Sequence, residues 1–297
     1  MGRPAERMAS MSSVPLGTSR TLPLGLKRRV DIWLQGTASL GLVEERQPQR
    51  LRWRCMSTAG ILIIGNEILS GKVQDENLPY LLPQLRQLGV SVERVQVLPD
   101  VVELIASEVR TFSKAFTYVI TTGGVGPTHD DVTMEGVARG TDSALAPHPR
   151  MEELLRKALK DKPPNASQLK MCMLPEGALL IETADLWFPL VRLGNVYVFP
   201  GIPRLLQKKF EGARDHFKGE PFFLRQVFVS CMESDVAQAL NEVLEEFPDL
   251  MLGSYPRLDQ QGYHTLLTLE SRDQAYVNQA LDALLARIPQ SELLRVE

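Results

Sequence analysis

Cysteine and histidine are scarce in this sequence, and long hydrophobic runs are missing. The 297 residues include 3 cysteines and 4 histidines. Cys55, Cys172 and Cys231 are far apart and have no metal-binding spacing, and they suit a reducing compartment or chance burial better than a disulfide framework. No apolar stretch approaches the ~20 residues that span a bilayer, so we expect no membrane association. The formal net charge of -3 lacks the basic excess typical of nucleic-acid binding, and we expect no nucleic-acid partner.

The N-terminal segment differs in composition from the rest of the chain. Residues 1–55 contain ten Lys and Arg residues against four Asp and Glu residues, and they are rich in Ser, Thr and Pro. This composition is typical of a mitochondrial transit segment, and a disordered tail without a targeting role has the same character. We therefore expect residues 1–56 to be a disordered or transit segment, with a location in the mitochondrial matrix. Translation from Met56 would instead give a cytoplasmic protein.

The most informative stretch is the glycine-rich segment TTGGVGPTHDD at residues 121–131. It follows an apolar run at residues 117–120, which predicts a buried strand, and it precedes residues 132–138, which predict the start of a helix. Glycines at such a junction let backbone N–H groups approach a phosphate closely, and three threonines add hydroxyl groups. The segment predicts a phosphate-binding loop, with a purely structural turn as the alternative.

Acidic residues accompany this loop. Asp130 and Asp131 would repel a bare phosphate, so the pair indicates a bridging divalent cation with oxygen ligands, such as magnesium. The alternative is that one of them caps the following helix. Glu67 directly follows the apolar run Thr58–Ile64, and open α/β sheets bind ligands outside the carboxyl ends of their strands. Glu67 is therefore a candidate ligand of the same cation or a general base, with a solvated turn acid as the alternative.

Hydrophobic periodicity predicts alternating strands and helices over most of the chain. Up to residue 218 this order predicts an α/β fold with a mostly parallel sheet and helices on both faces. Beyond a polar boundary near residues 218–221, the order strand, helix, strand, strand, helix predicts a small α+β lobe. The expected domains are therefore residues 57–218 and residues 219–297.

Some local features carry predictions of their own. Residues 65–71 predict a turn, and residues 170–174 predict a strand. Asp100 is expected to cap the helix that follows it. Pro83 lies inside the helical pattern of residues 75–88, where proline removes a hydrogen bond, so we expect a kink or a late helix start.

Several motifs occur in an order that resembles a known family. They are GNEILSG at residues 65–71, DEN at 75–77, TTGGVGPTHDDVT at 121–133, NVYVFPGIP at 195–203 and LGSYP at 252–256. This order resembles the molybdopterin-binding-type domain of molybdenum-cofactor biosynthesis proteins and of competence/damage-inducible (CinA-like) proteins. The likeness is greatest to the N-terminal half of animal FAD synthases. The resemblance implies a three-layer αβα domain with a small C-terminal α+β lobe.

The expected site combines the glycine loop, the residues that follow the first strand and a second strand–glycine–helix junction. The candidates for substrate binding are Gly65, Asn77, Thr121, Thr122, Gly123, Gly124, Gly126, Thr128, Pro200 and Gly201. The candidates for catalysis and for metal binding are Glu67, Asp130 and Asp131.

The resemblance implies cleavage of a dinucleotide pyrophosphate, FAD to FMN and AMP, or of ADP-ribose-like molecules. We expect a divalent metal, magnesium or cobalt, as the cofactor. A cation held by the three acids would lower the pKa of a bound water, and Glu67 or Asp130 would orient or deprotonate that water. His129 is expected to take no part. FAD synthesis itself is not expected, because the second domain of FAD synthases has no counterpart in these residues.

Two other functions are compatible with the same residues. The site would serve as a regulatory module that binds FAD, a related dinucleotide or a pterin nucleotide without chemistry. It would also serve a molybdopterin adenylyltransferase, which the small lobe makes the weaker alternative. Relatives of this fold often self-associate, so a homo-oligomer is expected.

Overall fold

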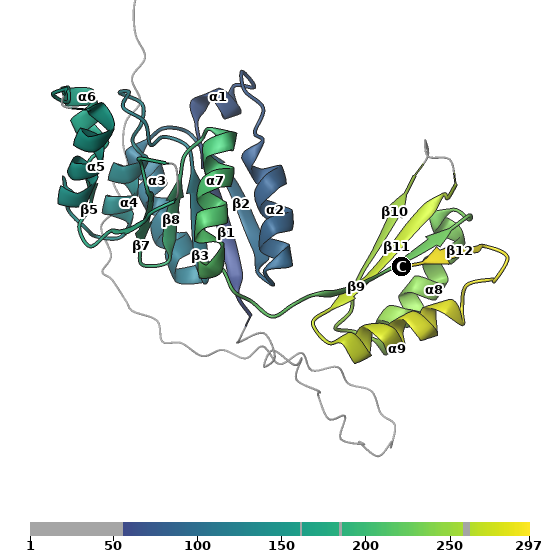
Figure 1. Ribbon diagram of the computed structural model, residues 1–297. Helices are drawn as coiled ribbons and strands as arrows, with labels where there is room; N and C mark the ends of the chain where they lie inside the picture. Colours follow the sequence, from purple (N-terminus) through teal and green to yellow (C-terminus); the bar gives the residue numbers. More distant parts are fainter. Residues whose placement is uncertain (1–55, 161, 184–185, 258–261) are drawn as a thin grey trace, which may run out of the picture. The chain divides into compact units, whose positions relative to one another are not determined.

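The computed structural model describes residues 56–160, 162–183, 186–257 and 262–297. The predicted transit segment therefore lies outside the described residues, apart from Met56. The larger part of the described chain is built on a six-stranded sheet with the order β2-β1-β3-β8-β7-β6 (Figure 1). A smaller part carries its own four-stranded sheet.

The four strands at one side of the large sheet are parallel. They are β2 (Ser91–Leu98), β1 (Thr58–Ile64), β3 (Tyr118–Thr122) and β8 (Val196–Phe199). The hairpin of β8 with β7 (Leu190–Leu193) adds an antiparallel strand, and β6 (Leu179–Ile181) pairs antiparallel with β7. The predicted mostly parallel sheet is confirmed. β4 (Leu145–Pro147) and β5 (Met173–Pro175) form a separate pair.

Helices cover both faces of this sheet, which gives the predicted three-layer αβα fold. One hydrophobic cluster joins Leu62 and Ile64 of β1 to α3 (Val102–Ala115), α4 (Thr133–Gly140) and α5 (Pro149–Leu159). The other joins Ile61 and Ile63 to α2 (Asn77–Gln87) and α7 (Pro203–Ala213). Successive residues of a strand point to opposite faces, so the continuous apolar run of β1 serves both clusters.

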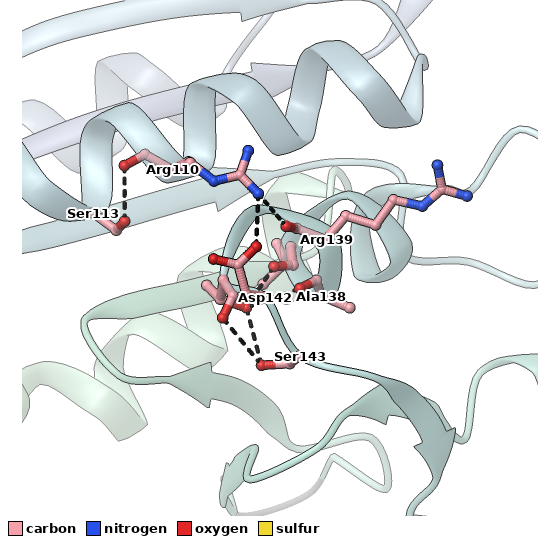
Figure 2. A network of polar contacts seen from close by, with 8 residues as sticks. Arg110, Ser113, Ala138, Arg139, Asp142 and Ser143 are labelled. Atoms are coloured by element: carbon pink, nitrogen blue, oxygen red, sulfur yellow. Dashed lines mark hydrogen bonds and ion pairs between the residues drawn. The ribbon is translucent and has the colours of Figure 1, made fainter.

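Close contact between α3 and α4 fixes the helix that follows the glycine loop. A Cβ at Gly136 would lie 2.4 Å from Ile105 Cγ2, and one at Gly140 would lie 2.8 Å from the carbonyl oxygen of Ala106. Figure 2 shows the polar contacts at the end of α4: the Arg110 guanidinium donates to the Arg139 carbonyl (2.7 Å) and to Asp142 Oδ1 (2.9 Å). These contacts satisfy the helix end, while tight packing positions the helix itself.

Four local predictions change in the structure. Residues 66–69 form a one-turn helix, α1 (Asn66–Leu69), inside the predicted turn. The helix α2 begins at Asn77 and contains Pro83, so the prediction that the helix would start late, near Pro83, is wrong. Residues 166–170 form α6 (Ala166–Lys170), which begins at a capping box of Asn165 and Gln168, and the strand expected at 170–174 begins only at Met173.

The fourth change concerns Asp100. Val101 occupies the N-cap position of α3 without a side-chain hydrogen bond. The Asp100 carboxylate instead accepts a hydrogen bond from the backbone N–H of Asn66 at 2.8 Å. It therefore holds the start of α1, which is distant in sequence but follows the neighbouring strand.

The smaller part of the described chain is an antiparallel sheet with helices α8 (Glu233–Glu246) and α9 (Gln274–Leu285). The strand order is β10-β11-β9-β12. The strands are β9 (Phe223–Val229), β10 (Met251–Pro256), β11 (Thr265–Ser271) and β12 (Leu293–Val296). The predicted α+β lobe is confirmed, with β12 as an additional strand. Within the described residues, no helix is long and apolar enough to span a bilayer.

Candidate functional site

The parallel strands bring three predicted site segments to one edge of the sheet. Ile63 pairs with Thr122, and Thr122 pairs with Phe199, so the carboxyl ends of β1, β3 and β8 are neighbours. The backbone N–H of Gly123 donates to the Phe199 carbonyl at 3.2 Å. Glu67, the glycine loop and Pro200-Gly201 therefore leave the sheet side by side, as expected for ligand sites of open α/β sheets.

The first two glycines of the loop are required by the backbone. Gly123 has φ +98°, and a Cβ there would lie 2.0 Å from the carbonyl oxygen of Ile64. Gly124 has φ +62°, and a Cβ there would lie 2.4 Å from Thr133 Oγ1. The Thr133 hydroxyl donates to the Gly123 carbonyl at 2.8 Å. A side chain at either glycine would push the loop away from β1 and from the start of α4.

The loop leaves backbone donors available for a ligand. Among the described residues, the N–H groups of Gly124, Val125 and Gly126 have no hydrogen-bond acceptor. Successive unpaired N–H groups beside a helix start form a concave site that favours anions. This arrangement is consistent with the predicted phosphate-binding loop.

Asn77 joins the second junction to this edge. Its side-chain amide donates to the carbonyl of Gly201 at 2.8 Å, and a Cβ at Gly201 would lie 3.3 Å from the Cα atom of Gly123. The Asp75 carboxylate accepts from the N–H groups of Asn77 and Leu78, which caps α2. Asn77 is 4% exposed, and its Oδ1 atom has no partner in the described part of the chain. The Asn77 Oδ1 atom can therefore accept a hydrogen bond from a ligand bound beside the two loops.

The two loop carboxylates differ in position. Asp131 Oδ2 accepts from the backbone N–H of Thr128 at 2.8 Å and from the Thr128 hydroxyl. The same hydroxyl contacts Asp130 Oδ1 at 2.6 Å. This hydroxyl contact, followed by a backbone hydrogen bond and the positive charges of His129 and Lys170, lowers the pKa of Asp130 below its ordinary value. Both acids are thus held by Thr128, and Lys170 binds the Thr128 carbonyl.

A cavity of about 610 Å³ opens over this edge, a volume typical of small-molecule sites. Most of the predicted site residues line it. They are Glu67, Asn77, Thr122, Gly123, Gly124, Gly126, Asp131, Pro200 and Gly201.

Four predicted residues do not line the cavity. The Thr121 side chain is buried on the other face of β3, since neighbours in a strand alternate, and its hydroxyl lacks a partner among the described residues. Gly65 leaves room for the Glu67 carboxylate, because a Cβ at Gly65 would lie 2.5 Å from Glu67 Oε1. Thr128 positions Asp131, and Asp130 is exposed.

The predicted metal site has fewer side chains than expected. In the described ranges, no three His, Cys, Asp or Glu side chains form a group that could hold a metal ion. Glu67 and Asp131 both line the cavity. Magnesium is commonly held by one or two carboxylates, with substrate phosphates and water at its other positions. The donor set therefore fits a cation that binds together with a phosphate ligand.

Sequence reasoning missed a second part of the lining. We call Leu186, Trp187, Phe188 and Lys209 the aromatic wall, and Glu67, Asp131 and residues 122–126 the glycine-loop wall. The rings of Trp187 and Phe188 meet edge to face, with centroids 5.5 Å apart.

One pattern could have revealed Lys209. The buried residues Leu206, Lys209, Phe210 and Ala213 of α7 follow helical spacing. A lysine in an otherwise apolar stripe is unusual.

Two family descriptions match the chain. Residues 60–213 match the family described as "Probable molybdopterin binding domain". Residues 221–297 match the family described as "FAD synthase, middle domain".

Relatives and solved structures agree with these matches. A protein from Archaeoglobus fulgidus is 34% identical over 221 residues, which cover 74% of this chain and 93% of the relative. A probable FAD synthase from Caenorhabditis elegans is 30% identical over 253 residues, covering 76% of this chain and 48% of the relative. The chain thus spans about half the length of this enzyme. The crystal structure of the CinA protein from Thermoplasma acidophilum covers 55% of this chain and 99% of its own, with 25% identity and a TM-score of 0.51.

Proposed function

This chain belongs to the family of probable molybdopterin-binding domains and carries an FAD synthase middle domain, and on that premise we propose that it hydrolyses the pyrophosphate of FAD. The observation that carries the proposal is the glycine-loop wall. Three backbone N–H groups without internal acceptors share one cavity with two carboxylates, Glu67 and Asp131. This combination suits a phosphate ligand that arrives with a divalent cation.

In this proposal the chain supplies binding and proton transfer. The N–H groups of Gly124, Val125 and Gly126 bind oxygens of one phosphate. The Glu67 carboxylate accepts a proton from a water molecule whose oxygen attacks one phosphorus atom. The bond from that phosphorus to the bridging oxygen breaks, and the bridging oxygen leaves on the other phosphate. The products are FMN and AMP, and one of them carries the oxygen of water.

Glu67 and Asp131 would hold the cation, whose chemistry is to neutralise phosphate charge and to lower the pKa of bound water. Asp131 is held for this role by the N–H and the hydroxyl of Thr128. Asp130 has a lowered pKa and stays ionised at neutral pH. Asp130 is the third acid of the predicted site. Because it lies outside the cavity lining, we assign it the role of adding negative charge near the cation without binding the cation directly.

A binding module without catalysis is the second candidate. It is favoured by the lack, among the described residues, of any group of three metal-binding side chains. The cavity would then hold a flavin or pterin nucleotide and release it unchanged. A molybdopterin adenylyltransferase is the third candidate, and it requires ATP.

Incubation of the purified full chain with FAD tests the proposal. We expect FMN and AMP in equal amounts when magnesium or cobalt is present, and no product when EDTA replaces the metal, as followed by chromatography. Glu67→Gln should lose the activity, and Glu245→Gln, on the exposed face of α8, should retain it.

The outcomes separate the candidates. Saturable FAD binding without product would support the binding module. Turnover of a pterin substrate that depends on ATP would support the adenylyltransferase. Either result, with no FMN formed under any metal, would refute FAD hydrolysis.

A further inference from the structure

Lys209 is a buried cationic side chain outside the predicted site. It is 2% exposed and lies on α7 between Leu206 and Ala213, which are fully buried. Lysine is almost never fully buried unless it has a polar partner, because its ammonium group loses hydration. The position of Lys209 therefore calls for a partner inside the fold or inside the cavity.

The internal contacts of Lys209 use only part of its hydrogen-bonding capacity. Its ammonium group donates to the carbonyl of Phe188 and lies 4.7 Å from the centroid of the Phe188 ring. No carboxylate among the described residues forms an ion pair with it. An ammonium group has three donors, so donors remain for a ligand. Desolvation by burial lowers the pKa of Lys209 to about 7, which agrees with an amine in an apolar environment.

Lys209 lines the same cavity as the glycine loop, but its neighbours are of another kind. Leu186, Trp187, Phe188 and Leu205 line the cavity with it. Lys209 is the one cationic residue in this lining, among the described residues. An apolar surface with a single donor suits a planar ring that carries a hydrogen-bond acceptor, since the ring gains contact area and its acceptor is satisfied.

A phosphate suits the aromatic wall less well. Phosphate oxygens are strongly hydrated and need several donors when they leave water. The glycine-loop wall supplies three backbone N–H groups, whereas the aromatic wall supplies one amine. The difference in donors assigns the phosphates to the glycine loop and the ring to the aromatic wall.

We propose that Lys209, together with Trp187 and Phe188, forms a subsite for a planar heterocycle with a ring carbonyl, to which the Lys209 amine donates a hydrogen bond. Flavin and pterin rings both have this chemistry. The inference rests on the proposed function only in that the ligand carries such a ring, and it requires no hydrolysis. Lys209 is thus a specificity-determining residue that selects the base of the nucleotide.

Two probes separate the ring from the phosphates: riboflavin is measured without metal, and inorganic pyrophosphate is measured with magnesium present. Riboflavin has the ring and no phosphate, and its binding is followed by flavin fluorescence. Inorganic pyrophosphate has no ring, and its binding is followed by calorimetry. For Lys209→Met in the full chain, we expect the dissociation constant for riboflavin to rise roughly tenfold or more, because one hydrogen bond to the ring is lost. The dissociation constant for pyrophosphate should stay the same.

Two further variants keep the test independent of folding. Lys208→Met changes an exposed lysine of the same helix and should leave both constants unchanged. Trp187→Ala removes the half-exposed ring and should weaken riboflavin binding while pyrophosphate binding persists. Circular dichroism confirms that each variant is folded.

Some results with these two probes would overturn the subsite, and others would refute only the proposed hydrolysis. Loss of pyrophosphate binding with normal riboflavin binding in Lys209→Met would show that Lys209 is a phosphate ligand. Unchanged constants for both probes, or a wild-type chain that binds neither riboflavin nor a free pterin, would also overturn the subsite. Lys209-dependent riboflavin binding without FAD cleavage would refute the proposed hydrolysis alone. FAD cleavage with a ring affinity independent of Lys209 would refute the subsite alone.

Discussion

The glycine-loop wall offers a ligand backbone N–H groups and carboxylates, whereas the aromatic wall offers rings and one buried amine. The first is built mainly from consecutive residues around Gly123 and Gly124, whose positive φ angles leave no room for a side chain, and Glu67 joins it from the end of β1. The second joins residues 186–188 to Lys209 of α7, some 20 positions further along the chain. The comparison shows that one cavity combines a charged surface for phosphates with an apolar surface for a ring.

The largest expected effect concerns the aromatic wall and the cost of burying Lys209. The pKa of Lys209 is about 7 in the folded chain, against an ordinary value of 10.5. Between these pH values the unfolded chain binds a proton that the folded chain does not, so the free energy of unfolding should rise with pH. Each unit of pKa difference corresponds to ~1.4 kcal/mol, so the total rise is several kcal/mol.

Lys209→Met should remove this rise and stabilise the protein at pH 7. Urea unfolding at pH 7.0 and at pH 9.5 measures the effect, with Lys208→Met as the matched control. If wild type and Lys209→Met gained stability in parallel over this range, the amine would not be desolvated in the folded chain.

The next effect separates the two acids of the glycine loop. Asp131 lines the cavity and Asp130 does not. Asp131→Asn should therefore lower metal-dependent FAD turnover about 100-fold, and Asp130→Asn should lower it less. Initial rates at saturating metal compare the two, with Asp282→Asn on α9 as a control. Equal losses for both acids would place Asp130 in the site as well.

Gly123 tests the backbone of the glycine-loop wall. Gly123→Ala places a methyl group at φ +98° and 2.0 Å from the Ile64 carbonyl oxygen. The left-handed conformation alone costs about 1–2 kcal/mol, and the contact adds to it. Thermal unfolding should show a lower midpoint, and pyrophosphate binding should weaken. Gly71→Ala is the comparison, because Gly71 also has positive φ but has open space around it. A Gly123→Ala chain as stable as Gly71→Ala would contradict the close approach.

The smallest effect sharpens the role of Thr128. Its hydroxyl is the main cause of the lowered pKa of Asp130. Thr128→Val should raise that pKa toward the ordinary value, which carboxyl-carbon NMR titration detects. A serine at this position should preserve the low pKa because it retains the hydroxyl. A pKa that stays low in Thr128→Val would assign the shift to the backbone and to Lys170.

Local sequence was sufficient for the framework of the large domain. The apolar run at residues 58–64 coincides with β1. The glycine loop was recognisable because positive φ angles exclude most side chains. Parallel strand order then predicted that Glu67 and the glycine loop would lie at the same edge of the sheet.

Tertiary structure decided which partners these groups contact and which of them line the cavity. Asp100 was expected to cap its own helix, but the neighbouring strand end presents the N–H of Asn66 to it. Thr121 and Thr122 are adjacent in sequence, yet only Thr122 lines the cavity, because strand neighbours point to opposite faces. The aromatic wall depends on a long-range contact between Phe188 and Lys209.

The sequence by itself determined most of the strands and helices and the glycine loop, because these depend on backbone geometry and on the spacing of neighbouring residues. Only the tertiary structure decided that Lys209 is buried and that it lines the cavity with Trp187. Burial and desolvation are properties of the whole packed chain. A lysine in a helix has the same local preferences whether its amine is in water or beside a ligand.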